Sequence, residues 1–135
     1  HAGGTLGKKL YLRVADVFTQ NEKPAVFANQ SLKEVIVEIT KKRLGVTAVV
    51  DENNNLAGII TDGDLRRMLE KKSDIENVLA KDIMTTGAKT ISEEELAITA
   101  LDMMRKNSIT QLVVTNQQKY QGIIHIHDLL KEGLI

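Results

Sequence analysis

The residue types best suited to chemistry in this sequence lie three positions apart, where an apolar run ends. Thr61 closes the run, and Asp64 follows in what we expect to be the first turn of a helix. The free amides of a helix start can bind a phosphate, and a carboxylate accepts hydrogen bonds from ribose hydroxyls. Gly63 would let a ligand approach the backbone closely, and Arg66 or Arg67 could add a charge-assisted phosphate contact. The same spacing also suits a plain helix cap, so capping and ligand binding both remain open.

A histidine pair marks a second candidate corner, at His125-Ile-His127-Asp128. Alternate residues of a strand point the same way, but a metal site needs further ligands and the sequence has no Cys. We therefore favour a helix cap or a cleft residue and expect no metal. When protonated, His125 could instead hold an anionic ligand.

Composition narrows the classes of function. The chain has 135 residues, no Cys, and 18 Lys and Arg against 18 Asp and Glu, so its formal net charge is zero. Non-specific nucleic-acid binders are normally basic, so we expect no nucleic-acid partner. No signal peptide and no apolar run near the ~18 residues of a membrane span is visible, which favours a cytoplasmic protein without membrane contact. The sequence shows no nucleophile–base pair, metal cluster or phosphate-binding glycine loop, so we expect neither free-standing catalysis nor a cofactor.

The elements that position these residues occur twice. A shift of 64 residues superimposes the two halves, and a shift of 66 superimposes their lead segments around Asp16 and Asp82. The matches at 64 are Leu32 with Leu96, Val49-Val50 with Val113-Val114, Gly58 with Gly122, Ile60 with Ile124, and Asp64-Leu65 with Asp128-Leu129. Internal repetition at this period indicates two copies of one structural unit.

Each copy begins with a short lead segment (14–18 and 80–84), followed by a loop and a helix. Ser31-Leu-Lys-Glu34 and Ser92-Glu-Glu-Glu95 both have the spacing of a capping box, which predicts a helix start at each. The helical spacing predicts two apolar faces, which are Leu32, Val35, Ile36 and Ile39 in one copy and Leu96, Thr99, Ala100 and Met103 in the other.

Two strands and a second helix complete each copy. We predict strands over 46–50 and 56–60 in the first copy and over 111–115 and 120–124 in the second, each pair joined by a polar turn. The second helices bury Leu65, Met68 and Leu69 in one copy and Leu129, Leu130 and Leu134 in the other.

A unit of about 60 residues has only a marginal hydrophobic core when it stands alone. This favours two copies that share one core. We therefore predict a mixed α/β fold of two pseudo-symmetric repeats, each with a small three-stranded sheet and two helices, packed sheet to sheet. A cleft between symmetric halves is a common ligand site. The predicted division is 1–13 as a lead-in, 14–72 as the first repeat and 73–135 as the second.

The repeated unit resembles a known family. The strand that ends at Val50, the following turn, and Leu56-Ala-Gly58-Ile-Ile-Thr61-Asp-Gly-Asp64-Leu65 are similar to the CBS domain, a regulatory repeat that works in pairs called Bateman modules. The resemblance covers residues 14 to 135. It implies a β/α fold and, commonly, the binding of adenosine nucleotides or related ligands.

Two stretches resemble one group of CBS proteins more closely. Thr61-Asp-Gly-Asp-Leu-Arg-Arg67 is similar to the first CBS repeat of the KpsF/GutQ-type arabinose 5-phosphate isomerases. The opening His1-Ala-Gly-Gly-Thr-Leu-Gly7-Lys8 resembles the end of their sugar-isomerase (SIS) domain, although Ala2 stands where the family usually has Pro. The resemblance implies that His1 is a remnant of the parent active site; a cloning remnant is the alternative.

The family resemblance also implies which residues contact a ligand. It assigns Thr61 and Asp64 to the phosphate and ribose of a nucleotide, and it adds Thr47, Ala48 and Val26 as ligand neighbours. In the second copy the equivalent cleft residues are His125 and Asp128. A histidine is no small hydroxyl donor, so a nucleotide site of the usual kind is in doubt there.

Two functions follow as hypotheses. The first is a regulatory CBS pair of an arabinose 5-phosphate isomerase in the pathway to Kdo, with a nucleotide or nucleotide-sugar such as CMP-Kdo or AMP as effector. The second is a ligand-free assembly module that holds the isomerase subunits together as a homodimer. Under both hypotheses we expect a homodimer through the CBS pair, with the SIS catalytic domain as the partner in the same chain.

Overall fold

The computed structural model describes residue 7, residues 9–71 and residues 74–135, and these fall into two compact units. We call the first the Thr61 unit; it contains residues 22–71, 74–88 and 117–120. We call the other the His125 unit; it contains the described residues up to 21 together with 89–116 and 121–135. His1, predicted to be a remnant of the SIS-domain active site, lies outside the described residues. Within the described ranges, no helix has the length and apolarity that a membrane crossing requires.

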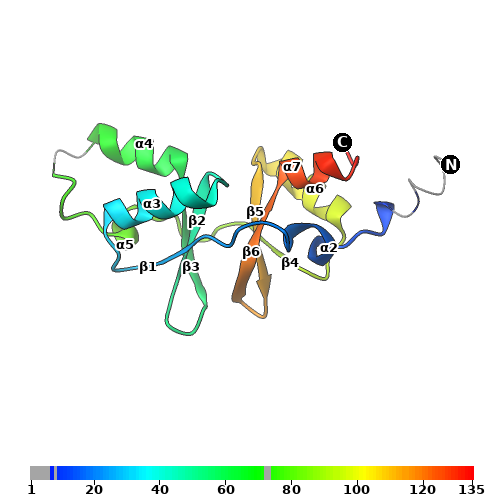
Figure 1. Ribbon diagram of the computed structural model, residues 1–135, viewed down its shortest axis with the longest axis horizontal. Coiled ribbons are helices and arrows are strands. Elements are labelled where there is room, and N and C mark those ends of the chain that lie inside the picture. The colour runs from blue at the N-terminus through cyan, green and yellow to red at the C-terminus, as the bar shows by residue number, and fades with distance from the viewer. Residues whose placement is uncertain (1–6, 8, 72–73) are drawn as a thin grey trace. The chain divides into compact units, whose positions relative to one another are not determined.

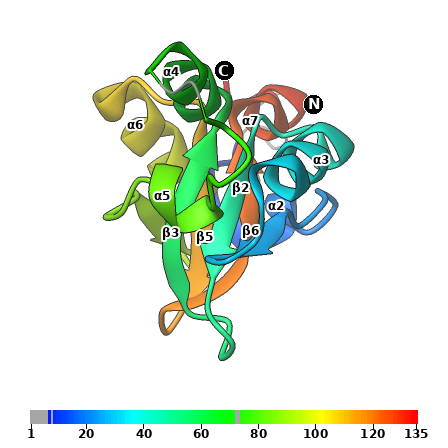
Figure 2. The same ribbon diagram turned by 90° about the vertical axis from the view of Figure 1, so that its left-hand side faces the viewer.

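The Thr61 unit is a three-stranded sheet with helices on one face (Figures 1 and 2). The order in the sheet is β1-β2-β3, with β1 parallel and β3 antiparallel to β2. Its elements are β1 (Ala25–Phe27), α3 (Leu32–Lys42), β2 (Val46–Val50), β3 (Leu56–Thr61), α4 (Asp62–Lys71) and α5 (Ala80–Ile83). Side chains of β1, β2, β3, α3 and α5 form its main core, and Leu32, Met68 and Val78 join α3 to α4.

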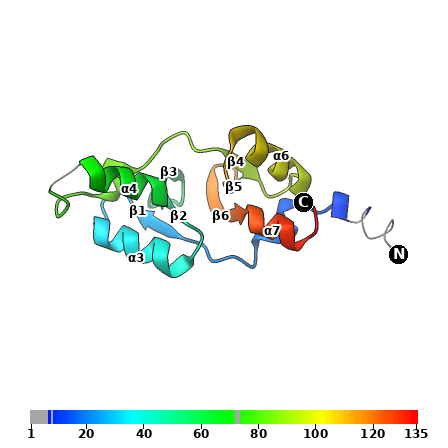
Figure 3. The same ribbon diagram turned by 90° about the horizontal axis from the view of Figure 1, so that it is seen from above.

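The His125 unit has the same plan (Figure 3). Its sheet has the order β4-β5-β6, and β4 is parallel to β5. Its elements are α2 (Val14–Phe18), β4 (Thr90–Ser92), α6 (Ala97–Asn107), β5 (Gln111–Asn116), β6 (Lys119–His125) and α7 (Ile126–Lys131). Together these elements confirm the predicted mixed α/β fold with two three-stranded sheets.

The two copies exchange their lead helices. The lead helix of the first copy, α2, contacts α6 and α7 of the second copy, within the His125 unit. The lead helix of the second copy, α5, contacts α4 of the first copy, within the Thr61 unit. The division 14–72 and 73–135 therefore describes repeats of the sequence, whereas each compact unit combines parts of both.

The capping box predicted at Ser31 is confirmed. The Ser31 hydroxyl accepts a hydrogen bond from the amide of Glu34 at 3.2 Å, and the Glu34 carboxylate accepts one from the Ser31 amide at 3.3 Å. Hydrogen bonds to Gln30 and Ser31 hold the pKa of Glu34 below its ordinary value. The charged carboxylate suits the positive end of the helix dipole.

The capping box predicted at Ser92 is wrong. Ser92 is the last residue of β4, and its hydroxyl accepts from the amide of Glu94 in the turn that follows. Helix α6 starts only at Ala97, with Leu96 as a cap residue that has no side-chain hydrogen bond. The pattern predicted no strand here, but Thr90 to Ser92 form one because they pair in parallel with Val113 to Thr115.

From the first strand of each copy to the hairpin the repeat offset is consequently 65 residues, and it is 64 only after the hairpin. Val26 pairs with Val49, and its counterpart Ile91 pairs with Val114, which fixes the register. The matches of Leu32 with Leu96 and of Val49-Val50 with Val113-Val114 were therefore one residue out. The buried face of α6 is Ala97, Ala100, Leu101 and Met104 instead of the face predicted from Leu96 to Met103.

Three further core assignments were wrong, all on helix surfaces. Ile36 is 38%, Leu69 52% and Leu130 48% exposed. Each lies next to a residue that takes the buried position, namely Val35, Met68 and Leu129. The helical period alone did not separate the centre of each apolar stripe from its edge.

Candidate functional site: the Thr61–Asp64 corner

The Thr61–Asp64 corner forms where β3 ends and α4 begins. The Asp64 carboxylate accepts hydrogen bonds from the amide of Thr61 at 2.9 Å and from its hydroxyl at 3.1 Å. The Thr61 hydroxyl also lies 3.2 Å from the amide of Asp64, which donates to it. The two side chains thus satisfy free amides at the helix start, and the capping alternative is realised in this structure.

The second oxygen of Asp64 is also occupied. It accepts from the Arg67 guanidinium at 2.7 Å and from the Thr85 hydroxyl at 3.4 Å. Partial burial would raise the pKa of Asp64, but hydrogen bonds from Thr61 and Arg67 outweigh it and hold the pKa below its ordinary value. The corner therefore presents a fixed, charged carboxylate at neutral pH.

Arg67 covers the corner, whereas Arg66 does not contact it. A Cβ atom placed on Gly63 would lie 3.3 Å from one terminal nitrogen of Arg67, so the guanidinium lies beside the glycine backbone. Arg67 is itself 62% exposed, which leaves it free to move. Arg66 is exposed, and no hydrogen bond or ion pair holds its side chain in the described structure. A ligand at Asp64 would have to displace or recruit Arg67.

The three strand residues assigned from the family resemblance are buried in the same unit. Thr47 and Ala48 pair with Ile60 and Ile59 of β3, one step along the sheet from Thr61. Both are fully buried, and the Thr47 hydroxyl donates to the Ala48 carbonyl at 3.1 Å. Val26 lies on β1 and pairs with Val49. Thr47 and Ala48 lie on the strand next to β3, and Val26 lies one strand further away. Within the described residues, no side-chain hydrogen bond joins any of the three to Thr61 or Asp64.

His125 caps the corresponding helix of the His125 unit. The Asp128 carboxylate accepts from the amide of His125 at 2.7 Å and from the side-chain amide of Asn21 at 2.7 Å. His125 Nδ1 accepts from the amide of His127 at 3.0 Å. Burial and the neighbouring His127 lower the pKa of His125, and Asp128 only partly opposes them. Among the described residues, no three His, Asp or Glu side chains converge as a metal site would require.

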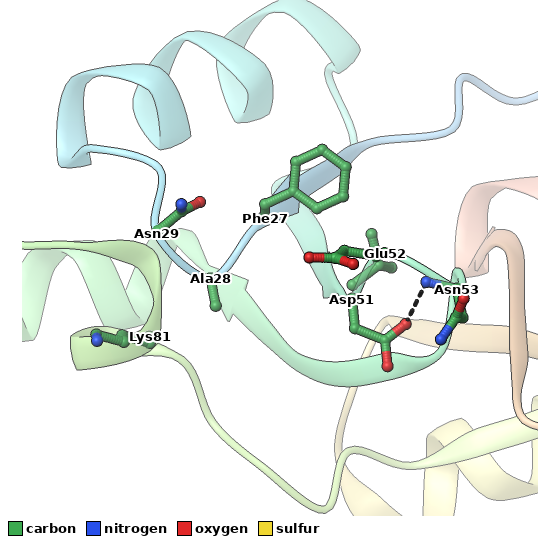
Figure 4. A pocket seen from close by; sticks show the side chains of 8 residues that line it. Phe27, Ala28, Asn29, Asp51, Glu52, Asn53 and Lys81 are labelled. Carbon is green, nitrogen blue, oxygen red and sulfur yellow. Dashed lines mark hydrogen bonds between the residues drawn. The ribbon is translucent and has the colours of Figure 1, made fainter.

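Sequence reasoning missed a hollow at the opposite end of β2 (Figure 4). It has a volume of about 540 Å³ and is lined by residues 27–29, residues 50–53 and Lys81. The signal that could have revealed the hollow is a pair of parallel strands, because such strands end at the same edge of a sheet and bring their following loops together. The short segment 25–27 was not identified as a strand, so this edge was not visible.

Comparison with known proteins identifies the family of the chain. Residues 14–71 and residues 80–134 each match the family model described as CBS domain. The chain belongs to the CBS domain family. The resemblance noted in the sequence, and the tandem arrangement with it, are confirmed.

Curated relatives match the chain over its whole length. The chain is 40% identical over 136 residues to the arabinose 5-phosphate isomerase KdsD of Yersinia pestis, and equally to that of Escherichia coli K12. It is 43% identical over 137 residues to KdsD of Pseudomonas aeruginosa. In each case the alignment covers 100% of this chain and 42% of the relative. The chain thus spans less than half the length of these relatives.

Solved structures share the fold. An acetoin utilization protein (AcuB) from Vibrio cholerae aligns with a TM-score of 0.82 and 21% identity, over 93% of this chain and 92% of that one. The CBS domain pair of MJ0100, solved with 5′-methylthioadenosine and S-adenosylmethionine, gives 0.79 and 24%, over 90% and 94%. CBSX2, solved with AMP, gives 0.76 and 20%, over 91% and 96%.

Proposed function

We propose that this CBS pair is the regulatory module of a cytoplasmic D-arabinose 5-phosphate isomerase, and that its Thr61–Asp64 corner binds a nucleotide or nucleotide-sugar. The observation that carries the proposal is the 40% identity to KdsD isomerases along the entire chain. The SIS catalytic domain of the parent would be the partner in the same polypeptide, consistent with the length that the relatives have beyond this chain.

The geometry of the corner supports the ligand class. A threonine hydroxyl and a charged carboxylate meet at the start of α4, beside a glycine and an exposed arginine. The carboxylate can accept from ribose hydroxyls, and Arg67 can turn from Asp64 towards a phosphate. Two structural neighbours were solved with adenosine ligands, AMP in one and S-adenosylmethionine in the other. CMP-Kdo, a sugar nucleotide of the proposed pathway, and AMP are the candidates we favour.

Calorimetric titration of the chain with CMP-Kdo, CMP, AMP and ATP tests the proposal. We expect saturable binding of at least one of them, weakened at least tenfold in the double variant Thr61→Val, Asp64→Ala. The control is Ser31→Val, Glu34→Ala, which removes the equivalent cap of α3 and should leave binding unchanged. If none of the four compounds binds the unmodified chain, the regulatory proposal is wrong for this module.

The second candidate function is assembly, and an apolar groove on the Thr61 unit favours it. The groove measures about 310 Å³ and is lined by residues of α3 and of the segment that leads to α5. Three of its apolar residues are exposed, namely Ile36, Val37 and Ile75. Exposed apolar residues that cluster in a groove are typical of protein–protein contact, and a second copy of the chain is the occupant we propose.

Two measurements separate the candidates. Sedimentation of Val37→Asp should show a smaller species than the unmodified chain if the groove holds a second copy. Regulation of the full isomerase should change in Thr61→Val, Asp64→Ala if the corner binds an effector. If regulation by every candidate nucleotide is unaltered in that variant, the corner is only a helix cap.

A further inference from the structure

The hollow at residues 27–29, 50–53 and Lys81 occupies an edge of the sheet that favours ligands. Strands β1 and β2 are parallel neighbours, with Phe27 paired to Val50 at their carboxyl ends. In open α/β sheets, ligands bind outside the carboxyl ends of parallel strands, where the following loops diverge. The hollow lies at this edge, and the Thr61–Asp64 corner follows the end of β3, which runs the other way.

Both walls of the hollow are held in place by hydrogen bonds. After β1, the amide of Phe27 donates to Gln30 Oε1 at 2.7 Å, and the amide of Lys81 donates to the Ala28 carbonyl at 2.9 Å. After β2, the Asp51 carboxylate accepts from the amides of Asn53 and Asn55, each at 2.9 Å. These bonds fix the backbone that carries the lining side chains, so little ordering is needed on binding.

Several of the other lining side chains are free for a ligand. Phe27 is 50% exposed although it is a large aromatic residue. In the described part of the chain, no hydrogen bond or ion pair engages the side chains of Asn29, Glu52 or Lys81. Figure 4 shows Lys81 on the α5 side of the hollow and Asp51 and Glu52 on the β2 side. The hollow therefore offers the cation of Lys81, the unengaged carboxylate of Glu52 and the exposed aromatic ring of Phe27.

The equivalent place in the His125 unit is bridged by a side-chain hydrogen bond. The amide of Ala15 donates to the Glu93 carbonyl at 2.9 Å, just as Lys81 does to Ala28, so these pairs correspond. There the Asn116 side chain donates to the Glu93 carboxylate at 3.1 Å and links the ends of β4 and β5. Alanine stands at the position of Lys81, and Ser92 at the position of Phe27. The charged and aromatic groups at this place therefore differ between the two copies.

We propose that this hollow binds a zwitterionic small molecule of the amino-acid type with an aromatic or apolar side chain. Lys81 pairs with its carboxylate, Glu52 with its ammonium group, and the Phe27 ring packs against its side chain. Opposite charges at the two walls favour a molecule with opposite charges at its two ends over a simple anion, because the lining contains one lysine together with two carboxylates. A volume of about 540 Å³ accommodates such a molecule.

The test is titration of the isotope-labelled chain with L-phenylalanine, L-tyrosine and L-leucine, followed by NMR. We expect saturable shifts at residues 27–29, 51–53 and 81 for at least one amino acid. Lys81→Gln and Glu52→Gln should each weaken binding about tenfold, the loss of one charge-assisted contact. Lys41→Gln, at an exposed lysine of α3 outside the hollow, should bind as the unmodified chain does.

Two ligand analogues test the charge pattern. N-acetyl-L-phenylalanine lacks the ammonium group and L-phenylalaninamide lacks the carboxylate, so both should bind at least tenfold more weakly than L-phenylalanine. No shifts with any of the three amino acids, or binding that Lys81→Gln and Glu52→Gln leave unaltered, would overturn the proposal. Thr61→Val, Asp64→Ala should leave these shifts in place, so the result is independent of the nucleotide proposal.

Discussion

The Tyr120 hydroxyl donates a hydrogen bond of 2.6 Å to the carbonyl oxygen of Pro24, immediately before β1. Tyr120 is fully buried within the Thr61 unit, although it is close to the start of β6. Burial, with a smaller contribution from Glu38, raises the pKa of its phenol, so the hydroxyl stays protonated and donates. The amide of Tyr120 also donates to the Asn54 carbonyl at 2.9 Å. One side chain from the second hairpin thus anchors the first strand of the sheet.

Tyr120→Phe should lower the free energy of unfolding by about 1 kcal/mol, because it removes one buried hydrogen bond and keeps the ring. The Pro24 carbonyl retains a second donor, the amide of Ala48 at 3.3 Å, which limits the loss. Urea unfolding measures the change. Tyr11→Phe is the control, because Tyr11 is 77% exposed and its variant should unfold as the unmodified chain does. An equal effect of both substitutions would contradict the anchoring role.

The two Ser-x-x-Glu motifs should respond differently to substitution. Ser31→Ala removes the hydroxyl that accepts from Glu34 at the start of α3, and should cost about 1 kcal/mol of stability. Ser92→Ala removes only a turn contact at the end of β4 and should cost clearly less. Thermal or urea unfolding of the two variants side by side checks this. A larger loss at Ser92 would mean that the second motif does cap a helix.

Gly58→Ala should destabilise the Thr61 unit. A Cβ atom at Gly58 would lie 2.8 Å from the carbonyl oxygen of Thr85, which is backbone and bonded to the same strand. Overpacking against fixed atoms typically costs about 1–3 kcal/mol. Gly63→Ala is the control, because its Cβ would lie nearest the flexible end of Arg67, at 3.3 Å, with the Thr61 hydroxyl at an ordinary 3.6 Å, and alanine favours a helix. Urea unfolding should rank Gly58→Ala well below Gly63→Ala in stability.

Acid should weaken the His125 unit through His125. Its imidazole accepts the amide of His127 through Nδ1, which requires the neutral form, and its folded pKa lies below the ordinary 6.5. The unfolded chain therefore binds a proton at His125 more readily than the folded chain does. This contribution to stability is complete above pH about 6.5 and is lost as pH falls from there through the lowered folded pKa.

His125→Asn isolates this effect, because asparagine is a good cap residue and does not titrate. We expect the unmodified chain to lose more stability between pH 7.5 and 5.0 than the variant does, as measured by urea unfolding. His127 and Asp128 also face His125, and both remain in the variant. Equal losses in the two proteins would show that His125 does not carry the pH dependence.

The sequence predicted the fold well where local rules decide it. The cap at Ser31 and strand β2 were correct because capping spacing and a largely apolar, β-branched run act locally. The second motif at Ser92 has the same spacing, yet pairing with β5 takes that residue into a strand. Such pairing involves residues far apart in sequence, so the motif alone could not reveal it.

The sequence likewise predicted the part of the candidate site that neighbouring residues form and missed the part that distant segments form. The corner of Thr61 and Asp64 follows from spacing three residues apart, and the structure brings the two side chains together. The hollow unites the end of β1, the end of β2 and Lys81 of α5, which come from three distant segments. The sequence did not reveal the hollow, because the parallel pairing of Phe27 with Val50 is needed to assemble it.

The exchange of lead helices has a consequence for synthesis on the ribosome. The amide of Val14 donates to the carbonyl of Glu95, and the amide of Ala97 to that of Leu12, so α2 docks on residues translated about 80 positions later. At roughly 5–20 residues per second, α2 emerges several seconds before its docking surface exists. A nascent chain halted after the first repeat should consequently expose the apolar side of α2, a target for chaperones until translation resumes.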